Sequence, residues 1–277
     1  MFSLVTAGQA LSAARAVAAH LPAGALYLDC NSCAPQTKQQ AALLIEAAGA
    51  RYVDVAVMAP VHPLLHRTPL LVSGPHAEDV LIVAAALDMD ARDAMGGVGH
   101  ASSIKLVRSI MMKGLEALAV ECVLAGRKLG VDDVVLASLE QTYPGFGWDR
   151  RTGQMLQRVM VHGIRRAVEM DEAARMVAEL GLPFAMASAT VEWQRRVGAL
   201  GLKRHQTVLD DAPRRARADA IIEALDEQTR EGLERQVLET TGGNRSTDYS
   251  VLSRSWRASS TSDTFAFQPL IAEPVPS

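Results

Sequence analysis

Aromatic residues, an excess of one charge and long apolar runs are all scarce in this chain of 277 residues. Aromatic residues make up 4% of it, which argues against a platform on which nucleic-acid bases stack. The formal net charge of -3 and the sequence pI near 6.2 lack the basic excess of a general nucleic-acid binder. The longest apolar runs, such as Val80–Leu87, are too short to span a bilayer. We therefore expect neither a nucleic-acid partner nor a membrane partner.

Cysteine is also scarce, and three residues make no disulfide framework. This usage favours a reducing cytoplasm, and residues Met1–Gly8 lack the basic start of a secretion signal. Two cysteines form the C-x-x-C spacing Cys30-Asn-Ser-Cys33. Because Pro35 places the following helix beyond both thiols, the spacing is not expected to form a redox site.

Two histidines, His62 and His66, have the i,i+4 spacing of a metal pair on a helix. Pro63 between them disfavours a regular helix, so we interpret both as loop residues. No metal site is expected from this sequence.

Residues 1–98 alternate strand-like and helix-like segments, which predicts a largely parallel α/β sheet. The expected strands are Phe2–Thr6, Ala25–Asp29, Arg51–Val57 and Pro69–Ser73. The expected helices are Gly8–His20, Pro35–Ala48 and Ala77–Leu87. Ligands of such sheets bind at the carboxyl ends of the strands. This rule places Thr6, residues 29–32 and residues 57–60 along one rim.

The pattern changes after Gly99, and from there to about Thr240 it predicts helices joined by short turns. We therefore expect an α/β region at 1–98, an all-helical region at 99–240 and a tail at 241–277. The tail is rich in Ser, Thr, Arg and Pro, so we expect it to lack stable structure of its own. The alternative is a tail that docks on a partner.

Lys105 lies one turn inside the start of a long, mostly apolar helix. Burial and the positive helix end both lower the pKa of a lysine toward the range useful for proton transfer. Lys105 is therefore a candidate general acid/base. The alternative is a solvated stripe on an amphipathic helix. The residues of that stripe would be Lys105, Arg108, Ser109, Lys113 and Glu116.

Several ordered motifs together resemble the β-hydroxyacid dehydrogenases, a superfamily that includes the 6-phosphogluconate and 3-hydroxyisobutyrate dehydrogenases. They are Asp29-Cys-Asn-Ser-Cys-Ala-Pro35, Tyr52-Val-Asp-Val-Ala-Val-Met-Ala-Pro60 and Gly99-x-Ala-x-x-x-Lys105. The pair Lys113-Gly114 and the segment His162–Met170 look most like a less characterised branch with a DUF1932-type C-terminal helical domain. The resemblance spans roughly residues 2 to 225.

The resemblance implies an incomplete Rossmann-type parallel sheet followed by an all-helical C-terminal domain, with the active site between them. Lys105 matches the catalytic lysine of the family. Asn31 and Ser32 match residues beside the nicotinamide and the substrate, and Thr6 and Ala7 match the loop that borders the cofactor. The implied cofactor is NAD or NADP.

Two departures from the family pattern bear on the substrate rather than on the reaction type. The substrate loop usually contains Ser-Gly-Gly, and this chain has Met58, Ala59 and Pro60 there. The family's asparagine one turn after the lysine is Ser109 here, which leaves Arg108 and Ser109 to supply polar contacts.

A third departure is the missing strand–Gly-x-Gly-x-x-Gly–helix unit that opens the family's fold and holds the pyrophosphate. The first expected strand aligns with the fourth strand of such a fold. About half of a Rossmann-type domain is therefore missing from this sequence. The simplest interpretation is a start codon assigned too late or a truncated gene. A degenerate non-enzyme and pairing with another polypeptide are the alternatives.

The first functional hypothesis is an NAD(P)-dependent dehydrogenase for a small anionic hydroxy acid. Lys105 would exchange the hydroxyl proton, and Arg108 would hold the substrate carboxylate. His162 and Arg165 would reach the substrate from the helical region. Alternatively, this basic cluster belongs to a surface helix in which Glu169 and Glu172 are its ion-pair partners.

The second hypothesis is a non-catalytic remnant that acts as a helical dimerisation or interaction protein. A third, a binding module for phosphorylated ligands, has no phosphate loop to support it. A homodimer is expected on either main hypothesis, because the helix after Lys105 is apolar almost all round.

Overall fold

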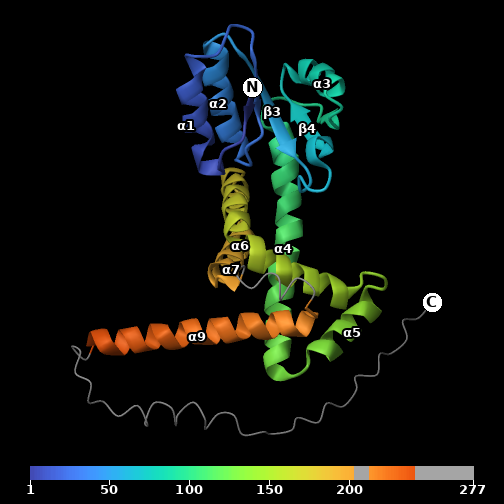
Figure 1. Cartoon of the computed structure of the whole chain (residues 1–277), viewed down its shortest axis with the longest axis vertical. Coiled ribbons are helices and arrows are strands. Elements are labelled where there is room, and N and C mark those ends of the chain that lie inside the picture. The colour runs from blue at the N-terminus through green and yellow to red at the C-terminus, as the bar shows by residue number, and fades with distance from the viewer. Residues whose placement is uncertain (203–211, 241–277) are drawn as a thin grey trace. The chain divides into compact units, whose positions relative to one another are not determined.

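The computed structural model describes residues 1–202 and 212–240 (Figure 1). The predicted tail at 241–277 lies outside the described residues. No helix formed by the described residues is long and apolar enough to cross a membrane.

The described part of the chain contains a five-stranded sheet with the order β1-β2-β3-β4-β5. Its strands are β1 (Phe2–Ser3), β2 (Leu26–Asp29), β3 (Arg51–Val57), β4 (Leu70–Ser73) and β5 (Ala91–Asp93). Three of the neighbouring pairs are parallel, and β3 pairs with β4 antiparallel. The predicted mostly parallel sheet is confirmed. The sequence did not predict β5, because this strand is only three residues long and has no alternation of apolar and polar residues.

Helices cover both faces of the sheet (Figure 1). On one face α1 (Ala10–Ala18) and α2 (Pro35–Ala47) pack with Tyr27 and Tyr52, whose rings stack across β2 and β3. On the other face α3 (Ala77–Ala86) packs against apolar residues of β2, β3 and β4. Successive strand residues point to opposite faces, so continuous apolar strands are buried on both sides.

The rest of the described chain is helical. It contains α4 (His100–Leu129), α5 (Asp132–Thr142), α6 (Trp148–Glu179), α7 (Ala185–Ala199) and α9 (Arg214–Thr240). One buried apolar cluster joins α4, α5, α6, α7 and the first turns of α9, and a second joins α4, α6 and α7. The structure thus shows an α/β region followed by helices, as the sequence predicts.

Two glycines bring α6 and α7 into backbone contact. A Cβ atom on Gly163 would lie 2.3 Å from the carbonyl oxygen of Gln194 and 2.8 Å from the Cα of Gly198. No residue with a side chain fits at this distance without separating the helices. Gly163 therefore sets the distance between α6 and α7.

A buried carboxylate links the helical region to the sheet region. Glu172 on α6 is 4% exposed, and its Oε2 accepts a hydrogen bond of 2.8 Å from the backbone N–H of Ala34. Ala34 is the N-cap residue of α2, where a negative charge interacts favourably with the helix dipole. This contact fixes α6 next to the loop that precedes α2.

Candidate active site

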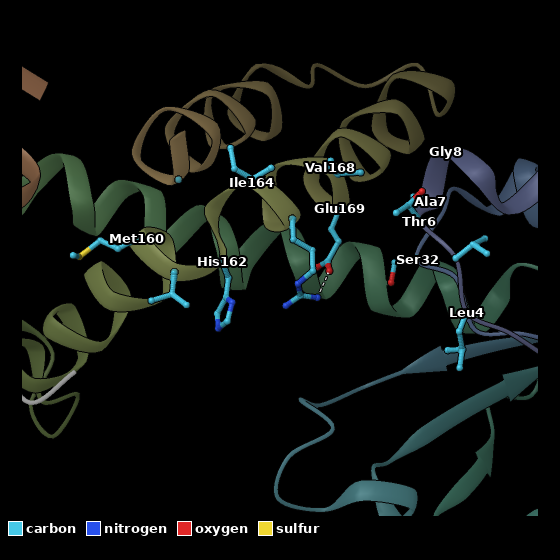
Figure 2. Close-up of a pocket in the computed structure, with 14 residues that line it drawn as sticks. Leu4, Thr6, Ala7, Gly8, Ser32, Met160, His162, Ile164, Val168 and Glu169 are labelled. Carbon is cyan, nitrogen blue, oxygen red and sulfur yellow. Dashed lines mark hydrogen bonds and ion pairs between the residues drawn. The ribbon is translucent and has the colours of Figure 1, made fainter. Parts of the chain in front are cut away.

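A cavity of about 1090 Å³ lies between the loops that follow β1 and β2 and one face of α6. Figure 2 shows Ser32 and the loop Leu4–Gly8 on one side, and His162 and Glu169 on α6. Because β1, β2 and β3 run parallel, their carboxyl ends lie at one edge of the sheet. The lining residues are Leu4, Val5, Thr6, Ala7, Gly8, Ser32, Met160, Val161, His162, Ile164, Arg165, Val168, Glu169 and Gly198.

Lys105 reaches this cavity through Ser32. Its Nζ donates a hydrogen bond of 2.6 Å to the Oγ of Ser32. Burial, together with the charges of Lys38, Lys113 and Arg165, lowers the pKa of Lys105 to about 8 against the opposing effect of Glu169. At neutral pH such a lysine exchanges protons far more readily than an exposed one.

The alternative of a solvated stripe on α4 is wrong. Lys113 is 6% exposed and Glu116 is 2% exposed, so two of the five stripe residues are buried. Glu116 forms ion pairs with Arg158 and Arg166 of α6. Lys113 and Glu116 therefore hold α4 against α6 instead of facing water.

Glu169 is a site residue that the sequence analysis considered only as an ion-pair partner. Its carboxylate lies 2.5 Å from Lys113 Nζ and 2.6 Å from Arg165 Nη1. Burial raises its pKa, but the charges of Lys113 and Arg165 outweigh this effect and hold the pKa below its ordinary value. Glu169, which Figure 2 shows on α6 beside the cavity, is therefore a carboxylate that organises two cations. The only signal in the sequence was its i,i+4 spacing from Arg165.

Lys113 has a lowered pKa, because burial disfavours its charged form and the contact with Glu169 only partly offsets this. Its Nζ also lies 3.5 Å from the Oγ of Ser109. Ser109, one turn after Lys105, is thus directed toward the Lys113–Glu169 pair.

Asn31 fixes the loops that follow β1 and β2. It is 3% exposed, and its Oδ1 accepts a hydrogen bond of 2.6 Å from the N–H of Val5. Its Nδ2 donates to Asp29 at 2.7 Å and to Ser3 at 3.0 Å. These bonds place Thr6 and Ser32 on the same side of the cavity.

Side chains of β3 and β4 cap the helix that carries Lys105. Asp54 Oδ2 accepts the N–H of Ser102 at 2.9 Å, and its Oδ1 accepts the hydroxyl of Ser102 at 2.6 Å. Ser73 Oγ accepts the N–H of Ala101 at 3.0 Å. These bonds satisfy amides of the first turn that have no partner within a helix.

Other residues named from the sequence lie elsewhere. The lining of the cavity does not include Met58, Ala59 or Pro60, and the N–H of Met58 bonds to Pro69 at 2.9 Å. Arg108 is exposed on α4. His162 and Arg165, in contrast, both line the cavity.

The C-x-x-C thiols are free and buried. Burial raises the pKa of Cys30 to about 11 and that of Cys33 to about 12, so both stay protonated at neutral pH. Within residues 1–202 and 212–240, no group of three or more His, Cys, Asp or Glu side chains is arranged to hold a metal ion.

Comparisons with known proteins place the chain in a family. Residues 127–197 match the family described as a domain of unknown function, DUF1932. A conserved hypothetical protein from Sinorhizobium meliloti 1021 is 34% identical, with a TM-score of 0.68 over 80% of this chain and 74% of that chain. The conserved protein MTH1747, described as similar in structure to 3-hydroxyacid dehydrogenases, is 31% identical. Its TM-score is 0.59 over 74% of this chain and 76% of that chain.

The chain belongs to the 6-phosphogluconate dehydrogenase-like superfamily, in the branch with a DUF1932 C-terminal domain. The resemblance inferred from the sequence motifs is thus confirmed. A 3-hydroxyisobutyrate dehydrogenase from Mycobacterium tuberculosis shares the fold, with 14% identity and a TM-score of 0.54. An uncharacterised 28.5 kDa protein from Methanothermus fervidus is 28% identical over 142 residues. The chain spans about half the length of that curated relative, 53%.

Proposed function

We propose that this protein is an NAD(P)-dependent oxidoreductase of the 3-hydroxyacid dehydrogenase type, acting on a small anionic hydroxy acid. The observation that carries the proposal is the contact of 2.6 Å between Lys105 Nζ and Ser32 Oγ, where Ser32 lines the cavity. Both residues match family motifs, and the fold of the relatives is that of 3-hydroxyacid dehydrogenases.

Lys105 and Ser32 together form an acid/base pair. In the oxidation direction the neutral amine of Lys105 accepts the proton of the substrate hydroxyl, and Ser32 Oγ orients that hydroxyl. In the reduction direction the Lys105 ammonium returns a proton to the carbonyl oxygen. A pKa of about 8 makes both protonation states accessible near neutral pH.

A nicotinamide cofactor fits the residues at the carboxyl ends of β1 and β2. Thr6, Ala7 and Ser32 line the cavity, and Asn31 holds their loops together. The cavity volume of about 1090 Å³ is slightly above the range for small-molecule sites, roughly 300–1,000 Å³. When bound, the cofactor would accept or supply the hydride. The described residues form no Gly-x-Gly-x-x-Gly turn, so our assignment covers the nicotinamide end only.

The charges on α6 favour an anionic substrate. Arg165 and His162 line the cavity, and the carboxylate of Glu169 balances only part of the positive charge of Arg165, Lys113 and Lys105. A substrate carboxylate would therefore find a net positive site. We propose His162 and Arg165 as its contacts, with Arg108 and Ser109 of α4 as further candidates.

We also propose that the protein is a cytoplasmic homodimer. Its three cysteines are free, which fits a reducing compartment. Apolar side chains on α4 are exposed at helical spacing, namely Ile104, Val107, Met111 and Leu118. Water-exposed apolar stripes of this kind are typical of interfaces, and a second copy of the chain would bury this one.

The direct test is a titration of this chain with NADH and NADPH by calorimetry, followed by a dehydrogenase assay with a panel of short hydroxy acids. We expect micromolar binding of one of the two cofactors and turnover of at least one hydroxy acid. Absence of binding would favour the alternative, a non-catalytic helical interaction protein.

A further inference from the structure

Lys38 is a buried lysine that the proposed reaction does not use. It lies on α2, its side chain is fully buried, and its Nζ is 3.0 Å from Asp29 Oδ1 and 3.3 Å from Asp54 Oδ1. It also donates a hydrogen bond of 2.7 Å to the backbone carbonyl of Asp29. One ammonium group therefore bridges the two neighbouring strands β2 and β3.

The two carboxylates occupy paired positions of the sheet, where Asp29 faces Asp54. Both side chains are fully buried, so two negative charges without a cation would repel each other in a medium of low dielectric. Burial alone would lower the pKa of Lys38, but the charges of Asp54 and Asp29 outweigh it and raise the pKa above its ordinary value. Lys38 is therefore a permanent cation that keeps the two carboxylates together.

Each carboxylate forms hydrogen bonds with a residue close in the chain to one member of the Ser32–Lys105 pair. Asp29 Oδ1 accepts the backbone N–H of Asn31 at 3.0 Å and its side-chain amide at 2.7 Å, which fixes the loop that carries Ser32. Asp54 accepts both the N–H and the hydroxyl of Ser102, one turn before Lys105. The ammonium of Lys38 is thus the link between the serine loop and the start of the lysine helix.

We propose that Lys38 is a positioning residue, whose buried ammonium holds the Ser32 loop and the first turn of α4 in the arrangement that brings Ser32 to Lys105. The inference rests on the proposed function only in the role given to Lys105. The groups that surround Lys105 electrostatically are Glu169, Lys38, Lys113 and Arg165. Removal of Lys38 deletes one of the three cations and loosens the contact with Ser32.

The test follows the titration of Lys105 by NMR in protein labelled with ¹³Cε-lysine. The chain contains five lysines, and the signal of Lys105 is assigned by its loss in Lys105→Met. In Lys38→Met we expect the titration midpoint of Lys105 to rise by roughly half a unit to one unit. In Lys38→Arg, which keeps the charge, the midpoint should stay near that of the unaltered protein.

Arg214→Met is the matched control, because Arg214 is also a buried cation held by carboxylates, among them Asp132 at 2.6 Å. This variant should lose stability without moving the Lys105 midpoint. Should Lys38→Met fail to fold, Lys38→Gln keeps a donor for the Asp29 carbonyl and tests the same shift.

An unchanged Lys105 midpoint in a folded Lys38→Met or Lys38→Gln protein would overturn the proposal. The same conclusion follows if Arg214→Met moves the midpoint as much. The measurement uses neither substrate nor cofactor, so this failure is distinguishable from a failure of the dehydrogenase proposal.

Discussion

The Nζ of Lys105 donates a hydrogen bond to the Oγ of Ser32 at 2.6 Å, although 73 residues separate them in the chain. Ser32 follows the carboxyl end of β2, and Lys105 lies in the second turn of α4. Their contact joins the cavity lining to a lysine with a lowered pKa.

Replacement of Lys105 by methionine removes the proposed proton acceptor while keeping a side chain of similar length. We expect turnover of hydroxy acids to fall by about two to four orders of magnitude, with cofactor affinity unchanged. Steady-state kinetics and a cofactor titration measure the two effects. Lys128→Met, which changes an exposed lysine of the same helix, should keep full turnover. Normal turnover in Lys105→Met would remove the lysine from the mechanism.

The direction of catalysis should determine the pH dependence. Oxidation needs the neutral amine of Lys105, so kcat/KM for oxidation should rise with pH and level off above about 8. Reduction needs the ammonium, so kcat/KM for reduction should fall above the same pH. Rate profiles measured in both directions test this opposite behaviour. Parallel profiles in the two directions contradict a role for Lys105 as the proton donor and acceptor.

A charge among the exposed apolar residues of α4 (Ile104, Val107, Met111 and Leu118) should weaken the proposed homodimer. Met111 is 71% exposed, and in a dimer Met111→Glu would bury an unpaired carboxylate. We expect light scattering to show a dimer for the unaltered protein and a monomer for the variant. Leu43→Glu is the control, because Leu43 is 73% exposed on α2 and should leave the assembly intact. A monomeric unaltered protein would contradict the homodimer.

The contact between α6 and α7 should not tolerate a methyl group at Gly163. We expect Gly163→Ala to lower the free energy of unfolding by about 1–3 kcal/mol, because the new Cβ meets backbone atoms of α7. Gly114→Ala is the matched control, since its Cβ would meet Thr190 at an ordinary distance of 3.7 Å. That variant should be neutral or more stable by up to about 1 kcal/mol. Urea denaturation of both variants provides the comparison, and equal stabilities would refute the close approach.

The contact between Glu172 and Ala34 should be important for stability. Glu172→Ala leaves the buried N–H of Ala34 without its acceptor at 2.8 Å, so we expect a loss of about 1–3 kcal/mol in unfolding free energy. Its exposed neighbour Asp171 provides the control, and Asp171→Ala should change stability by less than about 0.5 kcal/mol. Thermal unfolding monitored by circular dichroism measures both, and a Glu172→Ala protein as stable as this control would contradict the contact.

Much of the fold followed from local patterns. Apolar strand segments and Pro35 at the start of a helix are signals that act within a few residues, so β2, β3, β4 and α2 were placed close to their observed bounds. The short strand β5 was missed, because the polar residues Arg92 and Asp93 give no strand pattern. The division into three regions at 98 and 240 stays a prediction.

For the site, the sequence by itself determined the family, the candidate lysine and serine, and the basic residues of α6. These could be found because motifs in a fixed order are recognisable in the sequence without any knowledge of contacts. Only the tertiary structure decided which of these residues meet. It placed Ser32 against Lys105, brought Glu169 to Lys113 of α4, and buried Lys38 between Asp29 and Asp54. The physical reason is that such contacts depend on how strands and helices far apart in the chain pack. Burial and neighbouring charges then set the protonation of each group, and no local pattern records them.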